Sequence, residues 1–109
     1  MGKVQEIEAE EDLDTILASS GKKLVIVDFW ATWCGPCRVI GPHYHKISEE
    51  AQYDGVAFYS ADVDEVGELA ERFEISVMPT FIFFKEGEKV DEMSGANKEK
   101  LRELIEKYK

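Results

Sequence analysis

The strongest constraint on the fold of this chain is the segment 24–30, which is apolar on both of its possible faces apart from Asp28. Successive side chains of a β-strand point to opposite sides, so neither side of a strand built from these residues could face water. Such a strand is typical of the centre of a sheet that helices cover on both sides. The segment therefore predicts a layered α/β fold around one buried strand.

Strand-like and helix-like patterns alternate along the whole chain. The β-rich segments are 4–7, 24–30, 56–60, 80–84 and 89–93, and apolar residues at helical spacing occupy 13–17, 37–51, 66–73 and 98–108. This order implies parallel strand pairs joined by right-handed helical crossovers, followed by an antiparallel hairpin at the turn 85–88. We expect one α/β domain over residues 1–109, with a single mixed central sheet of about five strands flanked by four helices on both faces. Asn97 is expected to cap the last helix.

Charge and hydropathy exclude two classes of protein. The chain has 13 basic and 23 acidic residues, a formal net charge of −10 at pH 7, which argues against binding to the phosphates of nucleic acids. Its longest apolar runs, 24–27 and 81–84, are far shorter than the ~20 residues of a membrane-spanning helix. An acidic surface instead favours partners with basic docking patches.

Cysteine usage indicates the compartment. Only two cysteines are present, whereas a small secreted domain stapled by disulfides usually has about four to eight. The first residues contain no apolar stretch typical of a secretory signal. We therefore expect a cytoplasmic protein, with the nucleus as a further compartment. With no third cysteine, a covalent dimer that leaves both cysteines free to react is excluded, and we expect a monomer.

Both cysteines lie in the segment Trp33-Cys34-Gly35-Pro36-Cys37, directly after the predicted central strand and at the start of a predicted helix. Three interpretations of this C-x-x-C motif are weak. Zinc needs about four ligands, and the only histidines, His43 and His45, would point in different directions from a helix. A disulfide across this short loop would stabilise the fold by only ~2 kcal/mol. Inert thiols usually lie in apolar surroundings rather than at a helix N-terminus.

The fourth interpretation is a redox dithiol, which fits the position of the motif best. The first turn of a helix has unpaired N–H groups and a partial positive charge, and both stabilise a thiolate, the nucleophilic form of cysteine. Cys34 should be exposed at this terminus, whereas Cys37 falls on the same helical face as Ile40 and Tyr44 and should be more buried. One exposed attacking thiol and one sheltered resolving thiol suit thiol–disulfide exchange.

The segment 33–37 matches the active site of the thioredoxin family at every position. Asp28-Phe29-Trp30-Ala31, Met78-Pro79-Thr80, Gly87 and Gly95-Ala96 also resemble that family, in the same order. The stretch 94–98 is most similar to eukaryotic cytosolic members. The chain thus resembles the thioredoxin family over essentially its whole length, and the resemblance implies the thioredoxin fold.

The resemblance implies a general protein-disulfide reductase. The Cys34 thiolate would attack a disulfide of a target protein, and Cys37 would then resolve the mixed disulfide. Asp28 lies where the family has a buried acid, which would take the proton from Cys37. Bacterial members usually have a lysine where this chain has Ser60, so the environment of Asp28 differs from theirs.

The family's substrate-binding positions surround Cys34 in this interpretation. The residues expected to border an apolar patch there are Trp33, Gly35, Pro36, Met78, Pro79, Gly95 and Ala96. By resemblance, the peptide bond between Met78 and Pro79 is expected to be cis. Such a patch would suit the docking of flexible protein segments.

The resemblance also implies partners. A flavoprotein thioredoxin reductase, with FAD and NADPH, would restore the dithiol, and targets would include proteins such as peroxiredoxin, methionine sulfoxide reductase and ribonucleotide reductase. The chain would serve electron transport and cell redox homeostasis. No metal and no bound cofactor are expected beyond the redox-active disulfide Cys34–Cys37, because no Gly-rich dinucleotide fingerprint is present. Two other functions stay open: an oxidant or isomerase of disulfides, and a binding module that uses the apolar patch without redox turnover.

Overall fold

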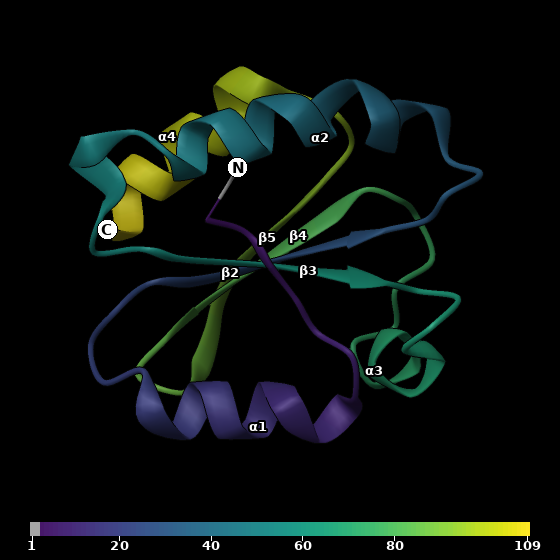
Figure 1. Ribbon diagram of the computed structural model, residues 1–109, viewed down its shortest axis with the longest axis horizontal. Helices are drawn as coiled ribbons and strands as arrows, with labels where there is room; N and C mark the ends of the chain where they lie inside the picture. Colours follow the sequence, from purple (N-terminus) through teal and green to yellow (C-terminus); the bar gives the residue numbers. More distant parts are fainter. Residues whose placement is uncertain (1–2) are drawn as a thin grey trace.

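The computed structural model describes residues 3–109, and in this part of the chain five strands form a single mixed sheet (Figure 1). The strands are β1 (Gln5–Glu6), β2 (Val25–Trp30), β3 (Ala57–Asp62), β4 (Thr80–Lys85) and β5 (Glu88–Ser94). The helices are α1 (Glu10–Ser19), α2 (Gly35–Ser48), α3 (Gly67–Arg72) and α4 (Lys98–Tyr108), with a 3₁₀ turn η1 (Ala51–Tyr53) after α2. The predicted fold class and order of elements are confirmed. None of the described helices has the length and apolar character that crossing a membrane requires.

Strand β2 lies at the centre of the sheet, whose strand order is β1-β3-β2-β4-β5. Helices α2 and α4 cover one face of the sheet, and α1 and α3 cover the other (Figure 1). Alternate residues of β2 enter different cores: Ile26 packs with α2 and α4, whereas Val25, Val27 and Phe29 pack with α1 and α3. Because side chains alternate along a strand, Asp28 shares the face of Ile26 and points toward the α2 side.

Strand β4 runs antiparallel to β2, although a helix separates it from β3 in the chain. Strands β1, β2 and β3 are parallel and β4 and β5 form a hairpin, as predicted. The alternation of strand, helix and strand implies a parallel pair at β4 as well, and that implication is wrong. Helix α3 has six residues and spans only ~9 Å, whereas the six residues of β3 span ~20 Å. The helix therefore does not carry the chain back along the sheet, and β4 begins at the end where β3 stops.

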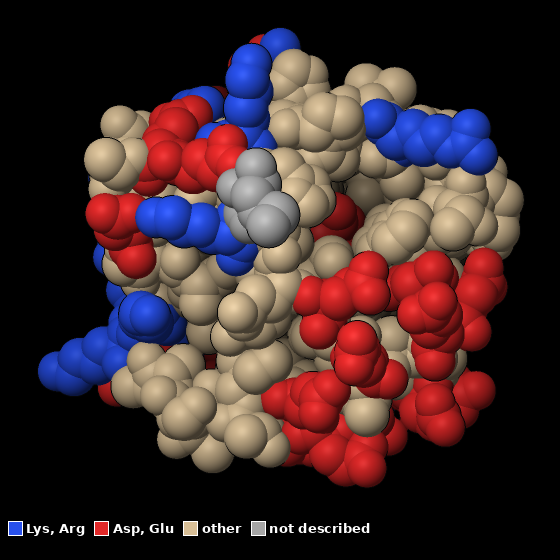
Figure 2. All heavy atoms as spheres, in the orientation of Figure 1, with Lys and Arg blue, Asp and Glu red and all other residues tan. Residues whose placement is uncertain are grey.

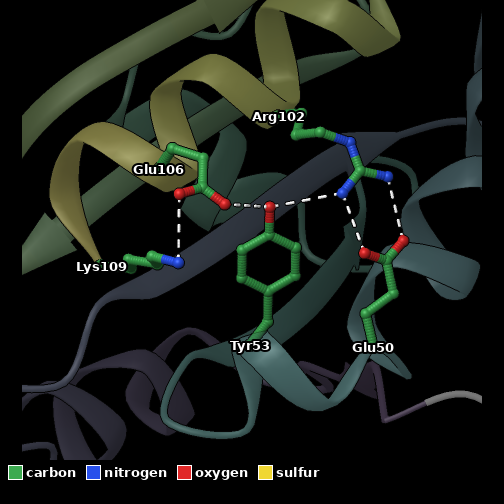
Figure 3. A network of polar contacts seen from close by, with 5 residues as sticks. All are labelled: Glu50, Tyr53, Arg102, Glu106 and Lys109. Carbon is green, nitrogen blue, oxygen red and sulfur yellow. Dashed lines mark hydrogen bonds and ion pairs between the residues drawn. The ribbon is translucent and has the colours of Figure 1, made fainter.

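Helix α4 is fixed near both of its ends by side chains. At the N-terminus, the Oδ1 atom of Asn97 accepts a hydrogen bond of 3.0 Å from the N–H of Lys100, so the predicted cap is confirmed. Near the C-terminus, the hydroxyl of Tyr53 donates to Glu106 (2.5 Å) and accepts from Arg102 (3.3 Å) (Figure 3). The helix is thus connected to η1 as well as to the sheet.

The same network joins α4 to the segment that follows α2. Arg102 makes contacts of 2.9 Å to both carboxylate oxygens of Glu50, and Lys109 pairs with Glu106 at 3.1 Å (Figure 3). These ion pairs are exposed, and each contributes little to stability. Tyr53, by contrast, is buried in the core that α4 covers. The network therefore holds α4 over the sheet, and with α4 the loop 95–97 that precedes it.

Replacement of Asn97 by alanine should lower the free energy of unfolding by about 1 kcal/mol, because the N–H of Lys100 loses its side-chain acceptor. Asn97→Asp is the matched control, since aspartate caps helices as well as asparagine does. Urea denaturation followed by circular dichroism measures both variants. An alanine variant as stable as the wild type would show that the cap does not stabilise the fold.

Candidate active site

Cys34 and Cys37 form a disulfide at the N-terminus of α2, with their Cα atoms 5.3 Å apart. Cys34 is the N-cap residue and Cys37 lies in the first turn. Between them, Pro36 lies where a missing N–H costs no hydrogen bond and a fixed φ suits a helix. The N–H of Cys37 points at the Sγ atom of Cys34 over 3.1 Å. The start of α2 is therefore arranged to stabilise negative charge on Cys34 once the disulfide is reduced.

Both cysteines are buried in this oxidised form, with exposed fractions of 6% each. The prediction that Cys34 is exposed and Cys37 is more buried is therefore wrong for this state. The disulfide holds the Cys34 sulfur in a small apolar cluster with Ala31 and Cys37, and Met78 packs against this cluster from the loop before β4. The Sγ atom of Cys34 lies 3.6 Å from the carbonyl oxygen of Met78. The exposed surface at this site belongs to the neighbours of Cys34.

The residues predicted to border Cys34 come from three loops at one end of the sheet. The strand pairings place the start of β4 and the end of β5 beside the end of β2. The exposed members of the predicted border are Trp33, Gly35, Pro36 and Ala96, the half-buried ones are Met78 and Gly95, and Pro79 is buried. The structure thus brings these residues to the same end of the molecule as the disulfide.

Two of these loops are joined by a backbone hydrogen bond. The N–H of Gly95 donates to the carbonyl oxygen of Pro79 at 2.9 Å. Gly95 has a backbone φ of +97°, a conformation that residues other than glycine rarely adopt. The Met78–Pro79 peptide bond is cis, as the resemblance predicted.

Asp64 and Val77 lie near the disulfide and were not identified from the sequence. The Nε1–H of Trp33 donates to Oδ2 of Asp64 at 2.9 Å, and no local pattern connects residues so far apart in the chain. Val77 is 54% exposed and adds apolar surface beside Met78. The available signal for Val77 was an apolar residue directly before the Met-Pro pair and outside any strand pattern.

Asp28 lies in β2 with only 5% of its surface exposed, which confirms the prediction that it is buried. Its Oδ1 atom has no hydrogen-bond partner among the described residues. Burial disfavours the charged carboxylate and raises the pKa of Asp28 from 3.8 to about 7. Its partner in β3 is Ser60, whose neutral hydroxyl brings no positive charge to offset this rise.

Asp28 and Cys37 line the same pocket, which has a volume of about 410 Å³ and also contacts Ser60 and Trp30. Figure 2 shows a hollow on the side of the molecule that carries β1 and α2, with acidic atoms deep inside it. A buried acid whose pKa is near neutrality is suited to accept and return a proton there.

The two histidines do not join the cysteines. His45 is exposed at the pocket that contains Asp28, whereas His43 is half-buried and lines a different pocket between α2 and α4. Across residues 3–109, no three His, Cys, Asp or Glu side chains are grouped as a metal site would require. The zinc interpretation of the C-x-x-C motif therefore has no support in the geometry.

Comparison with known proteins gives consistent matches. The sequence profile of the family described as Thioredoxin matches residues 4–107. Thioredoxin of the horse, Equus caballus, is 52% identical over 102 residues, which cover 94% of this chain and 95% of that protein. Thioredoxin of Homo sapiens is 50% identical over 102 residues, with 94% and 95% covered. The X-ray structure of Fasciola hepatica thioredoxin has a TM-score of 0.93 and 39% identity, and 97% of this chain and 100% of that chain are covered.

Replacement of Asp28 by asparagine should stabilise the protein at neutral and alkaline pH. In the unfolded chain the carboxyl ionises near 3.8, whereas the folded protein keeps it protonated up to about pH 7. The contribution of the protonated carboxyl to the free energy of unfolding is fully present below pH 3.8. It is lost as the pH rises through about 7. The difference between the two pKa values corresponds to roughly 4 kcal/mol.

Urea denaturation of both proteins between about pH 4 and about pH 8 measures this effect. The asparagine variant should gain on the wild type as the pH rises, with little difference at the acidic end. Glu6→Gln is the matched control, because the carboxylate of Glu6 is exposed and lines the same pocket. A gain that is the same at every pH would contradict the raised pKa of Asp28.

Proposed function

The chain belongs to the thioredoxin family and is a thiol–disulfide oxidoreductase that reduces protein disulfides, and from this premise we propose how its residues divide the reaction. Cys34 is the attacking cysteine, Cys37 the resolving cysteine, and Asp28 the base that serves Cys37. The observation that carries this assignment is the position of Cys34 as the cap of α2, with the N–H of Cys37 aimed at its sulfur.

The first step is attack by the Cys34 thiolate on one sulfur of a target disulfide. The target S–S bond breaks, a mixed disulfide forms between Cys34 and the target, and the other target sulfur leaves as a thiolate that takes up a proton. The helix N-terminus supports this step because its N–H groups and partial positive charge favour the thiolate form of Cys34.

The second step releases the target. Cys37 gives its proton to the carboxylate of Asp28, and the resulting thiolate attacks the Sγ atom of Cys34. The mixed disulfide breaks, the second target sulfur leaves as a thiolate, and the Cys34–Cys37 disulfide forms. Two electrons have then passed from the dithiol to the target. Proximity supports this step, since Cys34 and Cys37 are within one helical turn and Asp28 lines a pocket with Cys37.

We propose that targets dock on the border of Cys34. Its residues are Trp33, Gly35, Pro36, Met78, Pro79, Gly95 and Ala96. The exposed indole of Trp33 and the exposed side chain of Val77 supply apolar area, and the carbonyl oxygen of Met78 lies beside Cys34, where it can accept a hydrogen bond from an extended target segment. Acidic side chains gather around α3 and the N-terminal end of α1 (Figure 2), and they support partners whose docking surface is basic.

The remaining assignments are also proposals. The electron donor would be a thioredoxin reductase that uses NADPH and FAD, and targets would include peroxiredoxin, methionine sulfoxide reductase and ribonucleotide reductase. The chain would act as a monomer of one domain, residues 1–109, without a bound cofactor. The cytoplasm, and also the nucleus, would be its compartment, because a dithiol that must be re-reduced works in a reducing environment. Its role would be in cell redox homeostasis.

Reduction of insulin by NADPH and thioredoxin reductase tests the assignment of the two cysteines. Turnover should be lost in both Cys34→Ser and Cys37→Ser. The two variants should differ in a second readout, because Cys37→Ser retains the attacking thiol but not the resolving thiol. It should therefore accumulate a mixed disulfide with insulin, visible by non-reducing electrophoresis, whereas Cys34→Ser should not. A mixed disulfide in the Cys34→Ser variant would reverse the two roles.

The role of Asp28 is tested by single-turnover reduction of a small aromatic disulfide that releases one coloured thiolate at each step. In the wild type, the second release should speed up about tenfold between about pH 6 and about pH 8, as Asp28 loses its proton near pH 7 and becomes a base. Asp28→Asn should lose this pH dependence and leave the first release unchanged. Glu6→Gln, in the same pocket, should behave like the wild type. An unaltered second release in the asparagine variant would remove Asp28 from the reaction.

A further inference from the structure

The pocket that contains Asp28 is larger than proton transfer to Cys37 requires. Its volume of about 410 Å³ lies within the range of about 300–1,000 Å³ that small-molecule pockets usually occupy. It lies between β1, the central strands and α2, since its lining includes Glu6, Asp28, Ser60 and Gly41. A pocket of this size can hold an organic molecule in direct contact with Asp28.

The lining of the pocket includes a carboxyl group, that of Asp28, with an unpaired oxygen. Oδ1 of Asp28 is buried without a hydrogen-bond partner among the described residues. A buried acceptor that lacks a donor costs free energy, and a charged carboxylate without a counter-charge costs more. A ligand that brings a positively charged N–H donor would offset both costs. The required chemistry is therefore that of an ammonium group.

The rest of the lining suits a cation that carries an apolar body. Glu6 adds a second, exposed carboxylate at the pocket, and the ring of Pro42 and the half-buried indole of Trp30 add apolar wall. Arg38 also lines the pocket, and its guanidinium is directed to Thr32, to whose carbonyl oxygen it donates two hydrogen bonds of 3.2 and 2.7 Å.

The other titratable groups near Asp28 come from α2. His45 is exposed at the same pocket. Tyr44 is fully buried, its hydroxyl donates to the carbonyl of Tyr59 at 2.8 Å, and burial first and then the charge of Asp28 raise its pKa. Tyr44 therefore stays neutral, and its hydroxyl hydrogen is directed to Tyr59 rather than to Asp28.

We propose that this pocket binds a small primary ammonium ion with an apolar body, whose N–H groups donate to the carboxyl group of Asp28 while the body lies against Trp30 and Pro42. If Asp28 is the base for Cys37, as proposed above, the same ligand slows the release of the target and leaves the attack by Cys34 unaffected. The pocket then regulates the second step through residues that are not part of the proposed docking border.

The test uses the oxidised protein and two probes of nearly equal shape, benzylamine and benzyl alcohol. Amide chemical shifts of ¹⁵N-labelled protein are followed as each probe is added at about pH 8, where Asp28 is mostly ionised. Benzylamine should shift the amides of pocket residues and bind at least tenfold more tightly than the alcohol. Lowering the pH to about 6, where benzylamine remains protonated, should weaken its binding about tenfold as Asp28 takes up a proton.

Two variants make the result specific to the pocket. Asp28→Asn keeps the shape of the side chain and should abolish the preference for the amine. Gly41→Leu places a side chain on the pocket wall, where an added Cβ meets no atom within 4 Å, and should weaken the binding of both probes at least tenfold while Asp28 is retained. The amide spectrum of each variant reports whether it is folded.

Absence of benzylamine binding, equal binding of the two probes, or an unchanged preference in Asp28→Asn would each overturn the proposal. None of these results would affect the proposed reductase function, since no thiol chemistry takes place in the titration. Conversely, failure of the wild-type protein to reduce insulin, with intact benzylamine binding, would count against the proposed roles of the cysteines only.

Discussion

The layered fold of this protein depends on the exclusion of water from both faces of the central strand β2. Ile26 on one face and Val25, Val27 and Phe29 on the other are all buried, and this requires a helical layer on each side of the sheet. A parallel neighbour, β3, then needs a helical crossover, and α2 supplies it while covering one of the two faces. The N-terminus of α2 is consequently fixed just beyond the end of β2, and the two cysteines are fixed with it. The active-site position follows from the burial of a strand that itself takes no part in the chemistry, apart from one residue.

That residue is Asp28, and its burial destabilises the strand, whereas burial of the other side chains stabilises it. Every other side chain of β2 gains free energy by leaving water, whereas the carboxyl group of Asp28 loses its hydration and keeps Oδ1 unpaired. An apolar residue at this position would serve the fold better. The loss of stability is concentrated at the one place where a group of near-neutral pKa lies in a pocket with Cys37. Such a concentration of cost is expected where a site is built for chemistry rather than for packing.

Local patterns predicted much of this structure. The two-sided apolar run, the cap at Asn97 and the C-x-x-C motif at a helix start each depend on residues a few positions apart, and each is found where expected. The burial of Cys34 could not be predicted in this way, because it depends on contact with Met78, which is 44 residues away in the chain. The hydrogen bond from Trp33 to Asp64 likewise joins residues far apart in the chain. The pocket around Asp28 is a volume left between four elements, β1, β2, β3 and α2, and no pattern within any single element encodes it.

The short distance between the two cysteines has a consequence for kinetics. With Cα atoms 5.3 Å apart on one helical turn, a single pair of sulfur atoms must accept electrons and also deliver them. A donor and a recipient therefore react at the same sulfur atoms and cannot do so together, so the two half-reactions alternate in a ping-pong scheme. In such a scheme, excess of either partner competes with the other for the chain, and throughput depends on how quickly each product departs.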